Sequence, residues 1–516
     1  MSLPFRSRKY YGEEEDTLGE GTYGRVIRTD QGYAIKIISN DEDNIITSST
    51  LHEIVSLLKV TSPYLIPIID VIIDNQEETT NLVLPLADET LLEVMAEPSL
   101  DIKSLARQLC LGVAAIHNAN LLHLDLKPAN LLLHGLTQFS LFEKPGYDEA
   151  KLWIADLGIS RMHTCAFPPL QEEFFTLWYR SPEILLGGPV TAKADVWAVG
   201  VILAELFLSK HNNLKQVLLP GDSATDQLFK IFRLLGTPTS GPLTTLTDWK
   251  GNYPVWQEDL QGTLRRNGLS PEEIDLVGYI LNLDYIRRPN IFQVLEHPWF
   301  QPIEIPRKLT CFESLQRYAH YPQDKWPVKW HRQMTVDWLA EVVYGLKINF
   351  ESYALAVYLL DRIESLSTLP PNEIQLYGGA ALYISSSFYS TTEDLETFVS
   401  IADGAYTSNQ LQKAINVILI TTSFDLAVVT SYFFLSRAFL DNPNLRKTVI
   451  PIWRVSLLTP SHFTEPLLMA GSIIILADPT KPLIPRARRL LEEIMALPAN
   501  LNVRGVQSIL ANRPRV

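Results

Sequence analysis

Cysteine is scarce in this chain of 516 residues, which contains only three. Cys110, Cys165 and Cys311 stand far apart, and none belongs to a Cys-x-x-Cys pair. A disulfide framework needs several closely spaced cysteines, and a cysteine-based zinc site needs paired ones. The sequence therefore predicts neither, and it is typical of a protein from a reducing, intracellular compartment, either cytoplasmic or nuclear.

Positive charge is also in deficit. The chain has 44 Lys and Arg residues against 58 Asp and Glu residues, a formal net charge of -14 at pH 7. Proteins that bind nucleic acid generally carry a basic stripe that neutralises phosphates. The sequence therefore predicts no nucleic-acid partner.

Long apolar runs are missing as well. The densest apolar stretch, residues 414–440, is interrupted by Asn416, Asp425 and Arg437. A membrane-spanning helix requires about 20 predominantly apolar residues with few or no charges. We therefore expect buried helices of a globular protein here, and no membrane partner.

The length predicts more than one domain, because single cores usually stop growing at about 250–300 residues. Strand-like alternation dominates the first part of the chain, and helical periodicity dominates the rest, apart from two short strand-like runs at 130–135 and 151–158. These patterns divide the chain into a strand-rich lobe with a short tail (1–88), a helical lobe (89–302), a proline-containing linker (303–325) and an all-α module of one or two bundles (326–516).

The first chemical signal is a glycine loop. Gly19, Gly21 and Gly24 have the G-x-G-x-x-G spacing, and glycines let the backbone approach phosphates closely. Alone, the spacing fits a dinucleotide site or a plain hairpin equally well. The run Tyr33–Lys36 favours ATP instead, because it continues in strands where a dinucleotide fold would need a helix, and Lys36 stands where a phosphate-binding lysine is required.

Glu53 lies in the one helical stretch of the first lobe, residues 50–60. It is expected to pair with Lys36 and to fix the ammonium group of that lysine. The alternative is a solvated carboxylate on a helix face.

The decisive stretch is His-Leu-Asp-Leu-Lys-Pro-Ala-Asn at 123–130, followed by Asp156 in Ala-Asp-Leu-Gly. Phosphoryl transfer needs a carboxylate that accepts the hydroxyl proton, a cation near the γ-phosphate, and oxygen ligands for Mg²⁺. Asp125 and Lys127 supply the first two, and Asn130 and Asp156 supply the metal ligands. In this order, the set resembles the catalytic and metal-binding loops of the protein kinases and implies ATP and Mg²⁺ as cofactors.

Two further segments narrow the resemblance. The stretch Thr176–Leu186 is similar to the substrate-binding segment of the proline-directed kinases, and 194–200 with 220–238 is similar to the cyclin-dependent branch. The resemblance implies an α+β bilobal protein kinase fold with its N-lobe at 1–88 and its C-lobe at 89–302. It implies that Arg180 helps to accept a proline after the substrate Ser or Thr.

The same match assigns several supporting roles. Thr176 is expected beside Asp125, Asp195 is expected to brace the catalytic loop, and Glu183 is expected to pair with Arg288. The hinge falls at 84–87, where a backbone carbonyl and a backbone N–H would bind adenine. The expected ATP-binding residues are Leu18, Gly19, Gly21, Gly24, Val26, Ala34, Lys36, Leu84, Pro85, Ala87 and Asn130.

Three departures from the family pattern occur together. The family has arginines at the positions of Leu124 and His52, and a phosphorylated threonine at the position of Gln171; of the three phosphate-binding arginines, only Arg161 remains. A buried cation cluster without its anion would be costly, so their joint loss is physically coherent. We therefore expect activation without phosphorylation of this loop.

The segment 331–342 resembles the opening helix of a cyclin box, and later segments follow in cyclin order. An all-α cyclin fold is implied, with a first box at 326–440 and a second, shorter box at 441–516. By this match Arg332 and Asp337 form a structural ion pair. A covalent linker raises the effective concentration of two partners, so activation in cis by the chain's own cyclin-like domain is expected, in a monomer.

The resemblances together predict a proline-directed Ser/Thr protein kinase that acts on protein substrates with Ser/Thr-Pro sites. One alternative is a weakly active kinase–cyclin mimic, a scaffold that binds cell-cycle regulators. Another is a kinase that recruits a separate cyclin. Thr22 and Tyr23 match inhibitory phosphorylation sites of these kinases, although plain loop residues fit as well.

Overall fold

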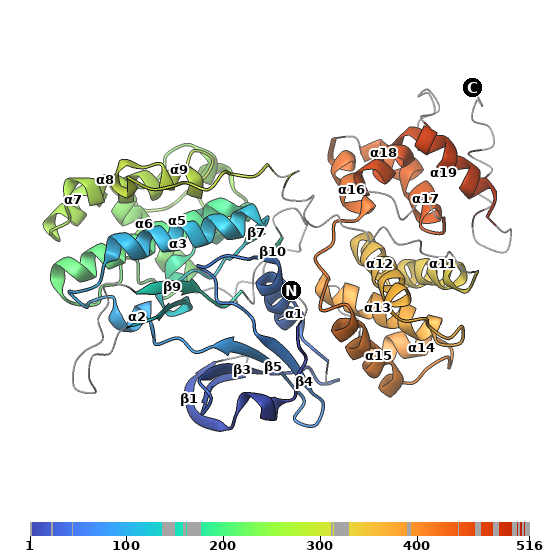
Figure 1. The fold of residues 1–516 in the computed structure, drawn as a ribbon. Helices are drawn as coiled ribbons and strands as arrows, with labels where there is room; N and C mark the ends of the chain where they lie inside the picture. Colours follow the sequence, from blue (N-terminus) through green and yellow to red (C-terminus); the bar gives the residue numbers. More distant parts are fainter. Residues whose placement is uncertain are drawn as a thin grey trace.

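The computed structural model of the chain has three parts, a small lobe, a large lobe and a helical module (Figure 1). The last strand of the small lobe ends at Pro85, the last helical turn of the large lobe ends at Phe300, and the first helix of the helical module begins at Trp330. Apart from isolated positions, the residues that the structure describes are 3–21, 24–43, 45–136, 150–157, 161–162, 177–310, 330–389, 394–441, 443–459, 466–477 and 485–497.

The small lobe is built on a five-stranded antiparallel sheet with strand order β1-β2-β3-β5-β4. Its strands are β1 (Glu14–Gly21), β2 (Gly24–Thr29), β3 (Tyr33–Ser39), β4 (Asp70–Asp74) and β5 (Thr79–Pro85). β-Branched residues fill β3 to β5, as suits a pleated and half-buried surface. A small apolar cluster that includes Tyr11, Ile27 and Ile35 covers one face of the sheet.

The expected helix of the small lobe is α1 (Ser48–Lys59). Thr47 caps it by accepting a hydrogen bond from the backbone N–H of Thr50, which satisfies one of the free donors at the helix start. Leu51, Ile54 and Val55 are buried on its inner side. The helix lies between the sheet and the helical module (Figure 1).

The large lobe is mainly helical. Its helices are α2 (Leu91–Val94), α3 (Ile102–Asn118), α4 (Pro182–Leu185), α5 (Ala192–Asn212), α6 (Ala224–Leu235), α7 (Leu260–Arg266), α8 (Pro271–Ile280) and α9 (Ile291–Leu295). Its short strands are β6 (Glu89–Thr90), β7 (Leu121–Leu122), β8 (Leu131–His134), β9 (Lys151–Ile154) and β10 (Arg161–Met162). β8 and β9 confirm the two strand-like runs predicted from the sequence.

A buried ion pair fastens the large lobe. Arg288 donates to both carboxylate oxygens of Glu183, at 2.6 and 2.9 Å, and neither side chain is exposed. Bidentate pairing of this kind satisfies the fixed geometry of the guanidinium group. The pairing expected from the sequence match is therefore confirmed.

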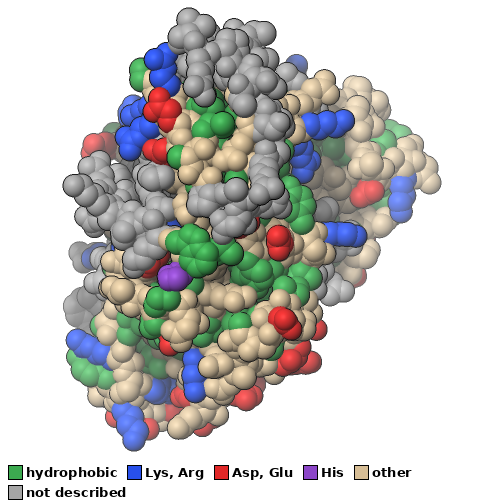
Figure 2. Space-filling view, turned by 90° about the vertical axis from the view of Figure 1, so that its right-hand side faces the viewer, with side chains coloured by type: hydrophobic (Ala, Val, Ile, Leu, Met, Phe, Trp, Pro, Cys, Tyr) green, Lys and Arg blue, Asp and Glu red, His purple; other side chains and the backbone are tan. Residues whose placement is uncertain are grey.

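The helical module consists of two groups of helices (Figure 1). The first contains α11 (Trp330–Gly345), α12 (Phe350–Leu366), α13 (Ile374–Phe388), α14 (Leu395–Ile401) and α15 (Ser408–Thr421). The second contains α16 (Ser431–Asp441), α17 (Arg446–Ser456), α18 (Pro466–Ala477) and α19 (Pro485–Met495). The resulting bilobal fold followed by an all-α unit confirms the predicted fold class. Figure 2 views the molecule from the side of this module and shows hydrophobic side chains gathered near the centre of the face.

The apolar stretch at 414–440 is divided between α15 and α16. In the part of the chain that the structure describes, no helix combines the length and the apolar character needed to cross a bilayer.

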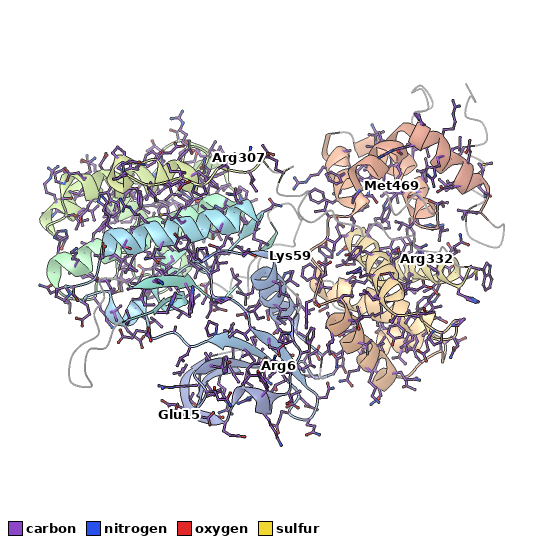
Figure 3. All side chains as sticks on the ribbon, viewed as in Figure 1. Arg6, Glu15, Lys59, Arg307, Arg332 and Met469 are labelled. Carbon is purple, nitrogen blue, oxygen red and sulfur yellow. The ribbon has the colours of Figure 1, made fainter. Side chains whose placement is uncertain are left out.

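Arg332, labelled in Figure 3, joins the two helix groups of the module. It makes a bidentate ion pair with Asp361 on α12 and donates to the carbonyl of Leu457, which follows α17. The sequence match had pointed to Asp337 as the partner of this arginine. The bidentate contact with Asp361 is made between two helices, and such contacts are hard to read from spacing along one helix.

Glu205 is a buried acid in the middle of α5. It accepts hydrogen bonds from the Tyr179 hydroxyl at 2.8 Å and from the backbone N–H of Leu218 at 2.9 Å. Burial raises the pKa of its carboxyl from 4.5 to about 7, although these two bonds oppose the rise. The carboxyl thereby anchors Tyr179, the neighbour of Arg180.

A pH-dependent stability follows from this raised pKa. In the unfolded chain the carboxyl loses its proton near pH 4.5, whereas in the folded protein it must become charged while buried. The free energy of unfolding therefore falls by about 3 kcal/mol as the pH rises from about 4.5 through about 7. The substitution Glu205→Gln removes that loss, because its amide can donate to the Tyr179 oxygen. We expect its melting temperature relative to the native protein to be higher at pH 8 than at pH 5. An equal difference at both values would contradict the assignment, and Glu304→Gln, at an exposed position, is the control.

Candidate active site

A cavity of about 370 Å³ lies between the two lobes. Its lining includes most of the expected ATP-binding residues together with Glu53 and Asp156. The expected residues that line it are Leu18, Gly19, Val26, Ala34, Lys36, Leu84, Pro85, Ala87 and Asn130. Gly21 and Gly24 do not line this cavity. The two lobes thus bring segments far apart in the sequence to one chamber.

The glycine loop forms the hairpin between β1 and β2. Gly21 pairs with Gly24 across the hairpin. A side chain at Gly19 would meet no other heavy atom within 4 Å, whereas one at Gly24 (φ +146°) would collide with the carbonyl of Ile37. Gly19 therefore leaves open space over the cavity, and Gly24 allows the hairpin to pack on β3. Thr22 and Tyr23 lie outside the described residues.

The sequence reasoning missed several apolar residues of the cavity. Leu57, Ile66 and Leu132 also line it. The sequence does not distinguish an apolar residue that faces a ligand from one that faces a core. Only Leu132 could have been predicted as a cavity residue, because it lies two residues after Asn130.

Lys36 stands at the centre of the charged groups in the cavity. Its Nζ lies 2.8 Å from each carboxylate oxygen of Glu53 and 2.9 Å from Asp156 Oδ1. The expected pair with Glu53 is therefore present. β3 presents the lysine, α1 presents the glutamate, and the loop after β9 presents the aspartate.

The charges in this triad depend on one another. Burial lowers the pKa of Lys36, but the two carboxylates outweigh that effect and raise it overall, so the lysine stays cationic. Burial raises the pKa of Glu53, and Lys36 offsets part of the rise. For Asp156 the lysine outweighs burial and holds the pKa below its ordinary value.

The loop before β8 brings three polar residues together. Lys127 Nζ lies 2.7 Å from Asp125 Oδ2, and the Asn130 amide donates to the same oxygen at 3.1 Å and to the Asp125 carbonyl at 2.9 Å. Asp125 is only 9% exposed. These contacts fix the direction of its carboxylate, as a positioned proton acceptor requires.

Asp195 on α5 braces this loop. Its carboxylate accepts from the backbone N–H groups of His123 and Leu124, at 2.9 and 2.8 Å, and contacts His117 Nε2 at 2.9 Å. Burial works against its charge, but the contacts with His117 and His123 together outweigh burial and lower its pKa. Leu124 has a positive φ of 68°, a conformation that a side chain disfavours and that the Asp195 bond helps to hold.

The donor set in the cavity suits Mg²⁺. Asn130 and Asp156 both line the cavity, and amide and carboxylate oxygens are the ligands that this hard cation prefers. The described residues contain no cluster of three or more His, Cys, Asp or Glu side chains that could hold a metal alone. Two protein ligands fit a metal that also binds substrate phosphates.

The expected substrate-binding residues are placed only in part. Arg180 is 8% exposed and lines a small crevice together with Leu124 and Asp125. Nearby, the Trp178 indole donates to the Gly221 carbonyl at 3.0 Å. Thr176 and Gln171 lie outside the described residues, as does the side chain of Arg161.

The helical module contacts α1 directly. His52 stacks on Phe388 at the end of α13, with ring centroids 4.5 Å apart and an interplanar angle of 26°. Lys59, labelled in Figure 3 at the end of α1, lies 2.8 Å from Asp425. The module therefore touches the helix that carries Glu53.

Smaller contacts extend this interface across the small lobe. Asp43 accepts from the backbone N–H of Leu395 through its carboxylate and from the Gln412 amide through its carbonyl. The turn between β4 and β5 reaches α15, where Asn75 and Asn416 are 3.2 Å apart. The loop before α1 and the far edge of the sheet are thus held as well.

Comparison with known families agrees with this geometry. The model of the protein kinase domain matches residues 12–300 of the chain. The chain belongs to the protein kinase family. The model of the cyclin N-terminal domain matches residues 307–427, so in this kinase a cyclin-like domain follows the catalytic lobes.

Three of the similar curated proteins come from plants. The chain is 36% identical to cyclin-dependent kinase B1-1 of Arabidopsis thaliana over 325 residues, covering 57% of this chain and 97% of the relative. It is 34% identical to cell division control protein 2 homolog D of Antirrhinum majus over 313 residues, covering 56% and 93%, and 32% identical to cyclin-dependent kinase B2-1 of Arabidopsis thaliana over 319 residues, covering 57% and 95%.

These matches confirm the sequence-based assignment at the level of the family. The protein is a Ser/Thr protein kinase of the cyclin-dependent type with a cyclin-like domain. They do not favour the scaffold alternative.

The geometry of Asp125 leads to a prediction about turnover. The substitution Asp125→Asn keeps the size of the side chain but removes a proton acceptor, so we expect kcat to fall by about 10²–10⁴-fold. ATP affinity should change little, because Asp125 does not line the cavity. Single-turnover phosphorylation and binding of a non-hydrolysable ATP analogue measure the two quantities.

The matched control is Asp88→Asn, which changes a carboxylate in the cavity wall. It should keep kcat within a few-fold of the native value. Equal losses in the two variants would show that Asp125 contributes only negative charge near the cavity and is not a specific proton acceptor.

Proposed function

We propose that this protein is an ATP-dependent, proline-directed Ser/Thr kinase that its own cyclin-like domain activates in cis, without phosphorylation of the activation segment. The observation that carries the proposal is the docked state of α1. The helix contacts the module at His52 and Lys59 while Glu53, between them, is paired with Lys36.

The physical argument concerns two positions of α1. An active kinase needs the lysine–glutamate pair in place, and the position of this helix controls it. Contacts at both sides of Glu53 favour the position in which the pair forms. Because the module is covalently linked, its local concentration is high and the docked state is favoured without a separate cyclin.

The chemical roles follow from the cavity. Asp125 accepts the proton of the substrate hydroxyl, Lys127 neutralises charge at the γ-phosphate, and Lys36 holds the inner phosphates. Asn130 and Asp156 hold Mg²⁺, which supplies charge neutralisation at the phosphates when bound. Pro85 and Ala87 bind adenine through their backbone.

Independence from phosphorylation is supported by what replaces the phosphate-binding arginines. His52 stacks on Phe388 of the module, at the position where the family pattern has a cationic arginine. Leu124 offers no charge. A phosphate on the activation segment would therefore find fewer cations to bind, so the module supplies the ordering that a phosphate would otherwise give.

Proline direction is supported by the position of Arg180. It shares a crevice with Asp125, next to the place where the acceptor hydroxyl must lie. The substrates are accordingly proteins with Ser/Thr-Pro sites, met by a monomeric enzyme in the cytoplasm or the nucleus.

The first test uses full-length protein from bacteria with no added cyclin or activating kinase. We expect it to phosphorylate a Ser-Pro peptide and to act at least tenfold more slowly on the matched Ser-Ala peptide. Asp156→Ala should abolish both activities, because it removes a metal ligand. Mass spectrometry should find the activation segment unmodified; activity that requires a phosphate there would contradict the proposal.

Activation in cis is tested by a charge exchange at the interface. Asp425→Lys places two cations together at the end of α1, and we expect kcat/KM to fall about fivefold, the size of a partly exposed ion pair. Adding Lys59→Asp restores the pair with its signs exchanged and should recover most of the rate. Equal rates in the single variant and the native protein would contradict control by the module.

A further inference from the structure

Residues 3–11 form a segment, here called the strap, that runs beside the small lobe before β1. Leu3 and Tyr11 are buried, with 7% and 2% of their surface exposed. Between them Phe5 is partly buried and packs against the large apolar cluster that includes residues of the module. Exposed tails bury little apolar surface. The strap buries side chains at both of its ends and packs Phe5 in between, so it is docked on the rest of the protein.

The strap is held to the small lobe by one carboxylate. Asp70, at the start of β4, is fully buried. Its oxygens accept from the backbone N–H groups of Phe5 and Arg6, at 2.9 and 2.8 Å, and from the Tyr11 hydroxyl at 2.7 Å. Hydrogen bonds to a charged group are the stronger kind, so the strap is fixed in its middle and at the end that leads into β1.

The Tyr11 phenol shows how closely this contact is made. Burial raises its pKa, and the hydrogen bond to Asp70 adds to the rise. Tyr11 therefore remains a neutral donor to the carboxylate, while its ring packs edge-on to Tyr33 on β3 at 5.3 Å.

The other side of the strap faces the helical module. The Phe5 ring stacks on Phe424, with centroids 6.4 Å apart and an interplanar angle of 26°. The residue next to Phe424 is Asp425, which binds Lys59 at the end of α1 and also accepts from the Tyr358 hydroxyl. Two adjacent residues of the module therefore hold the strap and α1.

The turn that carries these two residues is strained. Ser423 and Phe424 have positive φ values of 53° and 56°. Successive non-glycine residues in this region are costly and persist only where the surroundings hold them. Backbone bonds from Phe424 to Leu419 and from Asp425 to Thr422 fix the turn and point its two side chains at different partners.

From these contacts we infer that the strap is a second fastening between the kinase and its cyclin-like domain, and that Phe5 is a positioning residue that acts through Phe424. The strap couples β4 to the same turn that holds α1. It favours the module of the chain itself, because a cyclin without a large apolar side chain at this turn would leave Phe5 without the packing partner that Phe424 provides. The inference deepens the proposed function and rests on it where activity is concerned.

Hydrogen–deuterium exchange on the intact chain tests the strap. Phe5→Ala should make the amides of α1 and of residues 422–426 exchange about 5- to 20-fold faster, the size expected for an aromatic contact together with its buried area. Phe5→Leu, which keeps an apolar side chain, should restore most of the protection. Tyr10→Ala is the matched control, because Tyr10 is half exposed and packs on Arg6 and Tyr11 within the strap.

A double-mutant cycle separates direct contact from a general loss of stability. Phe424→Ala should accelerate exchange to a similar degree. In the double variant, the acceleration should be about two- to tenfold smaller than the product of the two single accelerations. Unchanged exchange in Phe5→Ala, or effects that simply multiply, would overturn the inference. Asp70→Asn should in addition speed exchange at the amide of either Phe5 or Arg6, since the two amides bond to different oxygens of Asp70 and the substitution leaves only one of them.

Exchange and catalysis report on different claims. If Phe5→Ala loosens the module while peptide phosphorylation stays at the native rate, the strap stands and control by the module fails. If exchange in α1 is unchanged, the strap is wrong whatever the catalytic rate.

Discussion

The ion pair between Lys36 and Glu53 is the interaction on which the arrangement of the cleft depends. It joins a strand of the small lobe to α1, and through Lys36 it also reaches Asp156 from the large lobe. A buried carboxylate without its cation would be costly, so α1 is held inward only while the lysine faces it. The same contact thus fixes the position of α1 and orients Lys36 and Asp156, the residues proposed to hold phosphate and metal.

The module contacts α1 on both sides of that pair. The module contacts the helix at His52 and at Lys59, one on each side of Glu53 in the sequence, and it holds the preceding loop at Asp43. The apolar side chains of the two parts belong to one continuous cluster. These contacts support the proposal that docking of the module and closure of the ion pair are coupled, in the manner of a two-state element that a bound partner biases.

The departures from the family pattern at positions 52 and 124 are compatible with this arrangement. An arginine at position 52 would need an anion, whereas His52 needs only a flat partner, which Phe388 provides. Leu124 keeps the strained backbone of the catalytic loop because Asp195 accepts its N–H. The losses remove a charge cluster but leave intact the groups that hold the catalytic loop in place.

Residue types and spacing alone predicted the chemistry and the family, because phosphoryl transfer permits few choices at Lys36, Asp125, Asn130 and Asp156 and these occur in short local motifs. The order of strands and helices was predictable for the same reason, since periodicity is a local property. Tertiary structure alone decided the partner of Arg332, the apolar wall of the cavity at Ile66, and the contact of Phe5 with Phe424. Each of these joins residues distant in the chain, and no local pattern records which surfaces meet.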